Sequence, residues 1–133
     1  MLVVQNLVGR LVEFRFPERM TAEIAADFVQ KTKLLLLARK QRVVTLGDLR
    51  RTKVMPPEVA QLIIALMKHD NPLVERTAFL YSDPAYGLQI ERGIREANNP
   101  NRRTFTSAAL ANAWLGELLD EKERARLLDF LEE

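Results

Sequence analysis

The sequence predicts an α/β protein whose sheet is mixed, mostly parallel, and begins with an antiparallel strand. Short apolar runs alternate with longer segments of helical periodicity, the order expected of parallel strands joined by helices. Only a short turn separates the first two runs, so their strands are predicted to pair antiparallel. The chain has 133 residues, the usual length of one domain with a single core.

The first two strands are predicted within residues 2–16. The run 2–4 begins the first strand, and 11–16 forms the second. In the second strand the apolar side chains share one face, while Glu13 and Arg15 share the other. We therefore expect one buried face and one partly wet face. Pro17 ends the strand, because proline cannot donate to the sheet.

The first helix is predicted over about 22–40, with Thr21 as its N-cap. Its apolar residues recur at helical spacing, but Leu34 and Leu37 widen the apolar sector near the C-terminal end. Two interpretations of that end remain open: it is deeply buried, or it meets another chain.

The middle of the chain predicts a strand, a helix and a second strand. Residues 43–46 are β-branched and bounded by charge, which is typical of an interior strand. Prolines 56 and 57 fit the opening of a helix that ends near Asp70. Residues 77–81 form another nearly continuous apolar run, again predicted as an interior strand.

The C-terminal third predicts three helices and a short edge strand. A helix capped by residues 82–84 runs to about Ala97, and 103–106 form the edge strand. Ser107 caps the next helix, and Asp120 with Glu123 has the spacing of a capping box for the last one. We expect a single domain over 1–133, with a core at 1–119 and a C-terminal helical extension at 120–133.

Composition excludes several classes of chemistry. The sequence contains no cysteine and one histidine, His69, which argues against thiol catalysis and against metal centres that need two imidazoles. Its five glycines form neither a P-loop nor a dinucleotide-binding fingerprint. The longest apolar run, 34–38, is far shorter than the ~20 residues of a membrane span. We expect a cytoplasmic protein that is not an enzyme, has no cofactor and does not insert into membranes.

Charge is unevenly distributed although the net charge is only +2. Residues 31–53 contain eight basic residues and one acidic residue, whereas 117–133 contain seven acidic and three basic residues. Such a separation favours an acidic partner or head-to-tail association of chains, although a solvated surface is the simpler interpretation. Aromatic residues fall on positions predicted to face the core, so no nucleic-acid binding is expected.

Ligands and partners of open α/β sheets usually meet the loops at the carboxyl ends of the strands. The basic loop after the strand at 43–46 and the loop after 77–81 share one edge if their strands are neighbours. For Asp48 and Ser82, the sequence fits a role in partner binding and a role in stabilising the turns equally well. For Arg50 and Arg51, it favours a role in binding. We expect a partner-binding site formed by the side chains of Asp48, Arg50, Arg51, Lys53, Tyr81, Ser82, Asp83 and Tyr86.

Several segments resemble the sulfate transporter and anti-sigma factor antagonist (STAS) domains, in particular the small stand-alone bacterial branch. They are residues 43–49, the helix that follows, 76–80, and 103–107 leading to 113–115. The resemblance covers most of 1–119. It implies a STAS-like mixed sheet with helices packed mainly on one side, and a non-enzymatic interaction or regulatory module.

The resemblance does not extend to the phosphorylation switch of this family. Aligning the family's aspartate-leucine pair on Asp48 and Leu49 places Pro57 where its serine would open the next helix. Proline cannot be phosphorylated, and Thr52 lies in the loop rather than at the helix start. We therefore expect a module that lacks the phospho-acceptor and binds another protein or a second copy of itself.

Two alternatives remain. The wide apolar sector of the first helix could line a pocket for a small apolar or anionic molecule, since similar stand-alone members are associated by name with lipid transfer. Alternatively, the helical C-terminus could hold the chain in a larger assembly.

Overall fold

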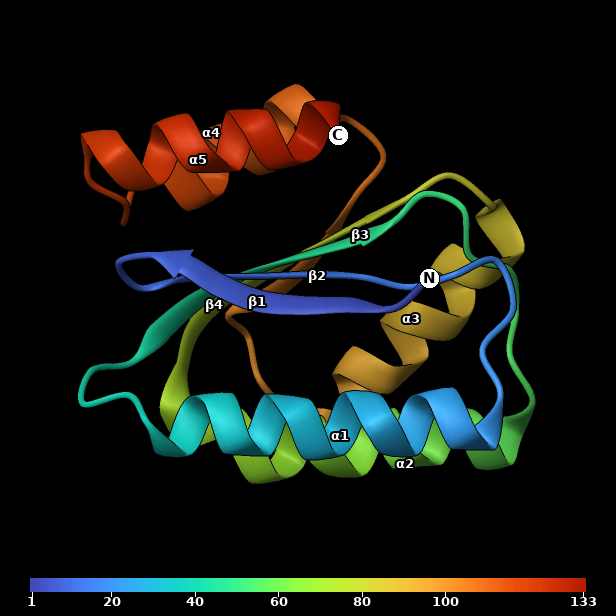
Figure 1. The fold of residues 1–133 in the computed structure, drawn as a ribbon. Coiled ribbons are helices and arrows are strands. Elements are labelled where there is room, and N and C mark those ends of the chain that lie inside the picture. The colour runs from blue at the N-terminus through green and yellow to red at the C-terminus, as the bar shows by residue number, and fades with distance from the viewer.

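The computed structural model describes residues 1–133 and contains one five-stranded mixed sheet (Figure 1). Strand β1 (Val3–Val8) is antiparallel to β2 (Leu11–Arg15). The other three strands continue the sheet in parallel and in sequence order: β3 (Val43–Leu49), β4 (Val74–Tyr81) and β5 (Arg102–Phe105). The predicted fold class is confirmed.

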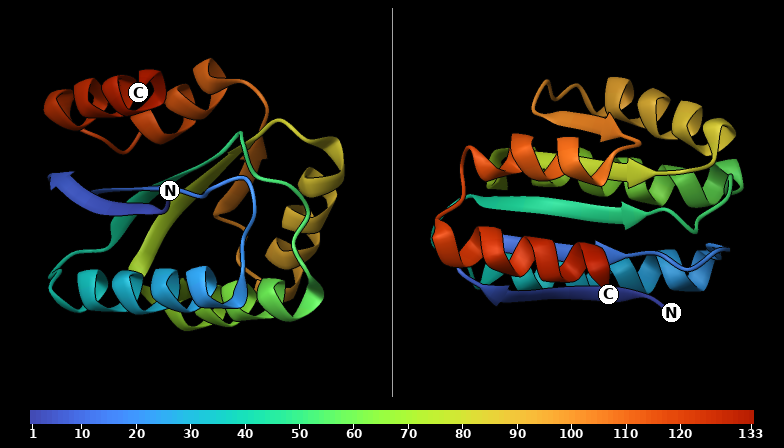
Figure 2. Two further views of the ribbon diagram at one scale, coloured as in Figure 1. Left: turned by 45° about the vertical axis from the view of Figure 1, so that its right-hand side comes forward. Right: turned by 90° about the horizontal axis from the view of Figure 1, so that it is seen from above.

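Helices cover both faces of the sheet (Figures 1 and 2). On one face lie α1 (Ala22–Leu37), α2 (Pro57–Asp70) and α3 (Pro84–Ala97); a 3₁₀ turn at Asn71–Leu73 connects α2 to β4. On the other face lie α4 (Ala108–Gly116) and α5 (Glu121–Glu132). Most of the helices therefore share one side, as expected, but the second side is covered as well.

The predicted helix starts are confirmed by their capping contacts. Thr21 Oγ1 accepts from the backbone N–H of Ile24 at 3.2 Å, and Ser107 Oγ accepts from that of Leu110 at 3.2 Å. Asp120 and Glu123 form the reciprocal capping box at the start of α5. Helix α1 ends at Leu37, three residues earlier than the sequence predicts, because the polar residues 39–42 form the connection to β3.

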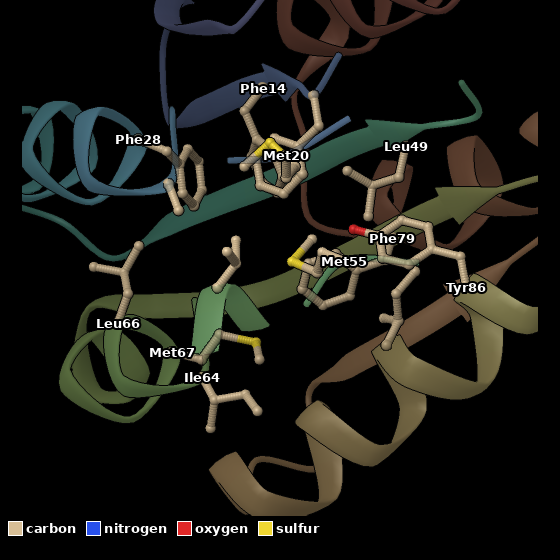
Figure 3. Close-up of a cluster of buried hydrophobic side chains, with 14 of the residues drawn as sticks. Phe14, Met20, Phe28, Leu49, Met55, Ile64, Leu66, Met67, Phe79 and Tyr86 are labelled. Atoms are coloured by element: carbon tan, nitrogen blue, oxygen red, sulfur yellow. The ribbon is translucent and has the colours of Figure 1, made fainter. Parts of the chain in front are cut away.

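Aromatic packing between β2 and α1 forms part of the larger core cluster (Figure 3). The ring centroids of Phe14 and Phe28 lie 5.0 Å apart, and those of Phe16 and Phe28 lie 4.7 Å apart. The Phe14 ring also lies directly over Gly47 of β3, where a Cβ atom would overlap it. A glycine in the centre of the sheet is thus required by this close approach.

The expectation of a partly wet face on β2 is wrong. Glu13 is fully buried, because α5 packs over this face with Leu127 and Phe130, which are also fully buried. The guanidinium of Arg126 donates to both carboxylate oxygens of Glu13, and Gln5 Nε2 donates to Oε1. Residue pattern alone indicates a wet face, since a buried carboxylate requires a partner that only the tertiary structure supplies.

Deletion of residues 120–133 is expected to unfold the protein. The deletion would expose the apolar side chains beneath α5 and leave Glu13 without its guanidinium partner. Far-UV circular dichroism with urea titration measures the outcome, and we expect no cooperative transition. A truncated chain that unfolds cooperatively would show that 1–119 is a self-sufficient core with an extension.

Substitution Trp114→Ala is expected to destabilise the fold by ~3–5 kcal/mol. Trp114 of α4 is buried in the core cluster between α4, α5 and the sheet, with the guanidinium carbons of Arg76 and Arg103 4.7 and 4.9 Å from its ring centroid. The measurement is urea unfolding followed by circular dichroism. Leu110→Ala is the matched control, because Leu110 is 63% exposed on the same helix. Equal effects of the two substitutions would contradict the structural role of Trp114.

Candidate functional site

The two loops that the sequence places in the partner site do lie on one edge of the sheet. Strands β3 and β4 are parallel neighbours, and Leu49 pairs with Tyr81 at their carboxyl ends. The arrowheads of both strands point to the same end of the molecule in Figure 2, right. We call this edge the strand-end rim and define it as residues 50–53 and 81–83.

Asp48 forms the buried base of the rim. Its carboxylate accepts from Arg15 Nε at 2.8 Å and from Arg50 Nε and Nη2 at 2.9 and 3.0 Å. Burial raises the pKa of Asp48, but the hydrogen bonds from Arg50 and Arg15 outweigh it and hold this pKa below the ordinary value of 3.8. Asp48 is only 5% exposed, so it positions its neighbours and has no free oxygen for a partner.

The same two arginines connect the rim to α5. Arg15 Nη2 donates to the carbonyl of Phe130 at 2.9 Å, and Arg50 Nη2 donates to the carbonyl of Leu131 at 2.8 Å. The Arg15 guanidinium also lies over the Phe130 ring, 4.2 Å from its centroid. These contacts add side-chain donors to carbonyls at the C-terminal end of α5, where few backbone donors remain; the Phe130 carbonyl also accepts from the backbone N–H of Glu133 at 3.2 Å. Arg50 thus has a structural role within the chain.

Arg51 and Lys53 are the cationic residues of the rim that remain available. Both are exposed, and neither forms a side-chain hydrogen bond or an ion pair. The backbone N–H of Lys53 donates to the carbonyl of Glu18 at 2.9 Å, which fixes the path of the loop. The side chains of Arg51 and Lys53 therefore project from a loop whose backbone is fixed by a hydrogen bond.

The loop after β4 exposes fewer side chains at the rim than the sequence predicts. Ser82 is exposed, while the half-buried Asp83 accepts from the Ala85 N–H at 3.1 Å as the N-cap of α3. Tyr81 is half-buried, with its ring against Gly87 in the first turn of α3. Tyr86 is 2% exposed and belongs to the core, where burial raises its pKa. The inclusion of Tyr86 in a partner surface is wrong, because its helical position turns the ring inward.

Arg15 is the residue that sequence reasoning missed. It lies opposite Asp48 in the parallel pairing of β2 with β3, although the two are 33 residues apart in the chain. Its position at the end of the second strand was visible in the sequence. Its partner became identifiable only once β2 was known to lie beside β3.

The start of α2 has no hydroxyl side chain available for modification. The helix begins at Pro57, and Pro56 occupies its N-cap position without a side-chain hydrogen bond. Thr52 is fully buried, and its hydroxyl donates to the carbonyl of Pro17 at 3.0 Å. The loop hydroxyl is thus used to anchor the loop to the end of β2.

A second polar cluster lies in the core between α1, α2 and the sheet. Arg102 is 7% exposed and donates to Thr77 Oγ1 and the Met67 carbonyl, both at 3.1 Å. Burial lowers its pKa to about 10, and burial raises the pKa of the nearby Asp70. These groups line a cavity of about 50 Å³. That is a third of the ~150 Å³ that holds one benzene, so the cavity does not accommodate a lipid.

The remaining features concern the single histidine, metal ligation and membrane-spanning helices. His69 lies at the end of α2, on the edge of the sheet opposite the rim, with Nδ1 2.9 Å from Asp70 Oδ1. No group of three histidine, cysteine or carboxylate side chains is arranged to hold a metal ion. No helix has the length and apolar character needed to cross a bilayer.

Substitution Asp48→Asn is expected to lower the free energy of unfolding at pH 7 by about 2 kcal/mol, the size of a charge-assisted hydrogen-bond contribution. The depressed pKa of Asp48 means that its contribution is present above its unfolded-state pKa and is lost as pH falls through the folded-state value. Urea unfolding from pH 7 to pH 3 measures this. The difference between wild type and variant should shrink below about pH 4; a constant difference would contradict the ion-pair role.

Comparison with known proteins supports the fold. No protein-family model matches the chain, and no curated protein matches it in sequence. Among solved structures, a DUF3478-family protein of uncharacterised function from Shewanella loihica PV-4, described as having a SpoIIAA-like fold, superposes with a TM-score of 0.66. The two share 14% sequence identity, and the match covers 86% of this chain and 92% of that one. The chain therefore has the SpoIIAA-like fold, the fold expected from its resemblance to STAS domains.

Proposed function

We propose that this protein is a non-enzymatic interaction module that binds an acidic surface of another protein through the strand-end rim. It acts without a phospho-acceptor at the start of α2. The observation that carries the proposal is the pair of exposed, unpaired cations Arg51 and Lys53 on a loop with a fixed backbone. A preorganised cationic loop attracts an acidic partner at a small entropic cost.

The immediate surroundings of the two cations fit a protein partner. Val54 is 52% exposed beside Lys53, and Ser82 presents a hydroxyl from the neighbouring loop. An apolar contact and a hydrogen-bonding group next to charge are typical of the mixed surfaces that proteins use to recognise each other. The resemblance to STAS domains, which act by binding other proteins, supports the same function.

Two features of the structure favour binding over catalysis and over small-molecule transport. The only histidine lies at the opposite edge of the sheet, so the rim has no imidazole to activate a nucleophile. The core cavity of about 50 Å³ is too small for a lipid, so no observation favours the alternative function.

The double substitution Arg51→Glu, Lys53→Glu is expected to weaken partner binding by at least about tenfold, because it places two carboxylates against an acidic surface. The measurement is affinity capture from a lysate of the source cell, followed by mass spectrometry and titration of the captured protein. Arg92→Glu, Arg95→Glu is the matched control, since it reverses two exposed cations on α3 that lie outside the rim.

A partner captured by wild type and control but lost with the rim variant would support the proposal. Equal capture by all three proteins would show that the rim cations are solvated surface and would exclude this site. Circular dichroism of each variant confirms that the fold is retained.

A further inference from the structure

We propose that the protein associates head to tail with copies of itself, through a basic end on one copy and an acidic face of α5 on the next. The basic end comprises residues 33–42, the last turn of α1 and the loop to β3. The acidic face comprises Glu121, Leu128, Asp129 and Glu132 on the outward side of α5. The basic end lies away from the strand-end rim, whereas Glu132 of the acidic face lines the same depression as Arg51. The inference goes beyond the proposed function, because it assigns a second interaction to the protein.

The basic end combines unpaired cations with exposed leucines. Lys33, Lys40 and Arg42 are exposed and form no ion pair, and residues 33–42 include no acidic residue. Leu34 is 61% exposed and Leu37 is 80% exposed, one helical turn apart. Of the two interpretations of this segment, burial in the chain's own core is thus wrong for these two leucines. Two exposed leucines on one turn, bordered by unpaired cations, are the feature of this segment that favours a contact with another molecule.

The surface beside these leucines is hollowed. A depression of the surface is lined by the loop residues 38–41 and by Gly9 and Arg10 from the turn between β1 and β2. Arg39 Nη1 donates to Asn6 Oδ1 at 2.6 Å, which holds the loop against that turn. Three cationic side chains and no acidic one line the depression; Arg10 is paired with Glu75 at 2.7 Å, whereas Arg39 and Lys40 form no ion pair. The depression therefore fits a convex partner that carries carboxylates.

The outward side of α5 has the complementary chemistry. Leu128 is 49% exposed, and the exposed Glu121 and Glu132 lie on its side of the helix, two turns before it and one turn after it, with the exposed Asp129 next to it in the chain. Two basic residues of α5 are exposed as well: Lys122, and Arg124, whose Nη1 donates to the carbonyls of Gly116 and Leu119. The opposite side of α5 packs on the sheet through Leu127 and Phe130. Among the exposed charged residues of α5, three are acidic and two are basic. The excess of acidic side chains around Leu128 complements the basic depression, which is also lined by the apolar residues Ala38 and Val43.

The two surfaces cannot be joined within one molecule. Helices α1 and α5 lie on opposite faces of the sheet (Figure 1). Contact between them must therefore involve different copies and is heterologous: each copy keeps one free basic end and one free acidic face. Such an interface generates open chains or closed rings rather than a dimer with a two-fold axis.

The test uses two variants of opposite charge. Lys40→Glu, Arg42→Glu makes the basic end acidic, and Glu121→Lys, Asp129→Lys makes the acidic face basic. All four side chains are exposed, and none forms a side-chain hydrogen bond or ion pair in the monomer. Sedimentation velocity over a range of protein concentrations measures association of the wild type, of each variant and of their equimolar mixture.

Wild type is expected to sediment faster as its concentration rises at about 0.05 M salt, and this effect should weaken at about 0.5 M salt, where charges are screened. Each variant alone should associate at least about tenfold more weakly than wild type. The equimolar mixture should recover association, because each end then finds an oppositely charged surface. Recovery by mixing distinguishes a direct charge contact from loss of fold.

Three results would overturn the inference: a wild type that stays monomeric, a variant that associates like wild type, or a mixture that does not recover. A monomeric wild type that co-sediments with vesicles containing phosphatidylserine would assign the basic end to a lipid surface instead. The single rim variant Lys53→Glu should self-associate normally, because Lys53 does not line the depression that Arg51 shares with Glu132. Its result separates failure of this inference from failure of the proposed rim function.

Discussion

The attachment of α5 to the sheet is the constraint on which the rest of the structure depends. Two buried carboxylates on the sheet, Glu13 and Asp48, are compensated by arginines that also contact α5 or belong to it. A buried carboxylate without such a partner would cost several kcal/mol. The same contacts that compensate these charges therefore hold the last helix over the second face of the sheet.

This arrangement explains why the two arginines of the rim, Arg50 and Arg51, and the neighbouring Arg15 have different roles. Arg15 and Arg50 share Asp48 and satisfy the last carbonyls of α5, so their donors are used inside the molecule. Arg51 has no such partner and projects from the same loop. The buried network thus fixes the backbone on which the exposed cations stand, and this rigidity favours specific binding by reducing the ordering that a partner must impose.

The two proposed surfaces use opposite edges of one sheet for different purposes. The carboxyl ends of the parallel strands present the rim, and the opposite edge presents the basic end with its exposed leucines. An assembly built through the basic end and α5 would leave the rim of every copy open to a partner. Repetition of a weak site along such an assembly would raise its effective affinity.

The sequence by itself determined the order of elements, the helix caps and the α/β class, because these follow from local periodicity and from side chains that bond to nearby backbone. It also predicted that the basic loop and residues 81–83 share one edge if their strands are neighbours, because parallel neighbouring strands end together; the pairing of β3 with β4 in the structure meets that condition. Only the tertiary structure decided which charged residues are available. Glu13 is buried because α5 returns over the sheet and supplies Arg126 as its partner. Asp48 is buried beside Arg15, which lies 33 residues away in the chain, and Tyr86 packs in the core against residues of other elements. A local sequence pattern contains no information on such distant partners. Because these partners determine whether a charged side chain is buried or exposed, only the tertiary structure shows which charged residues can form a binding surface.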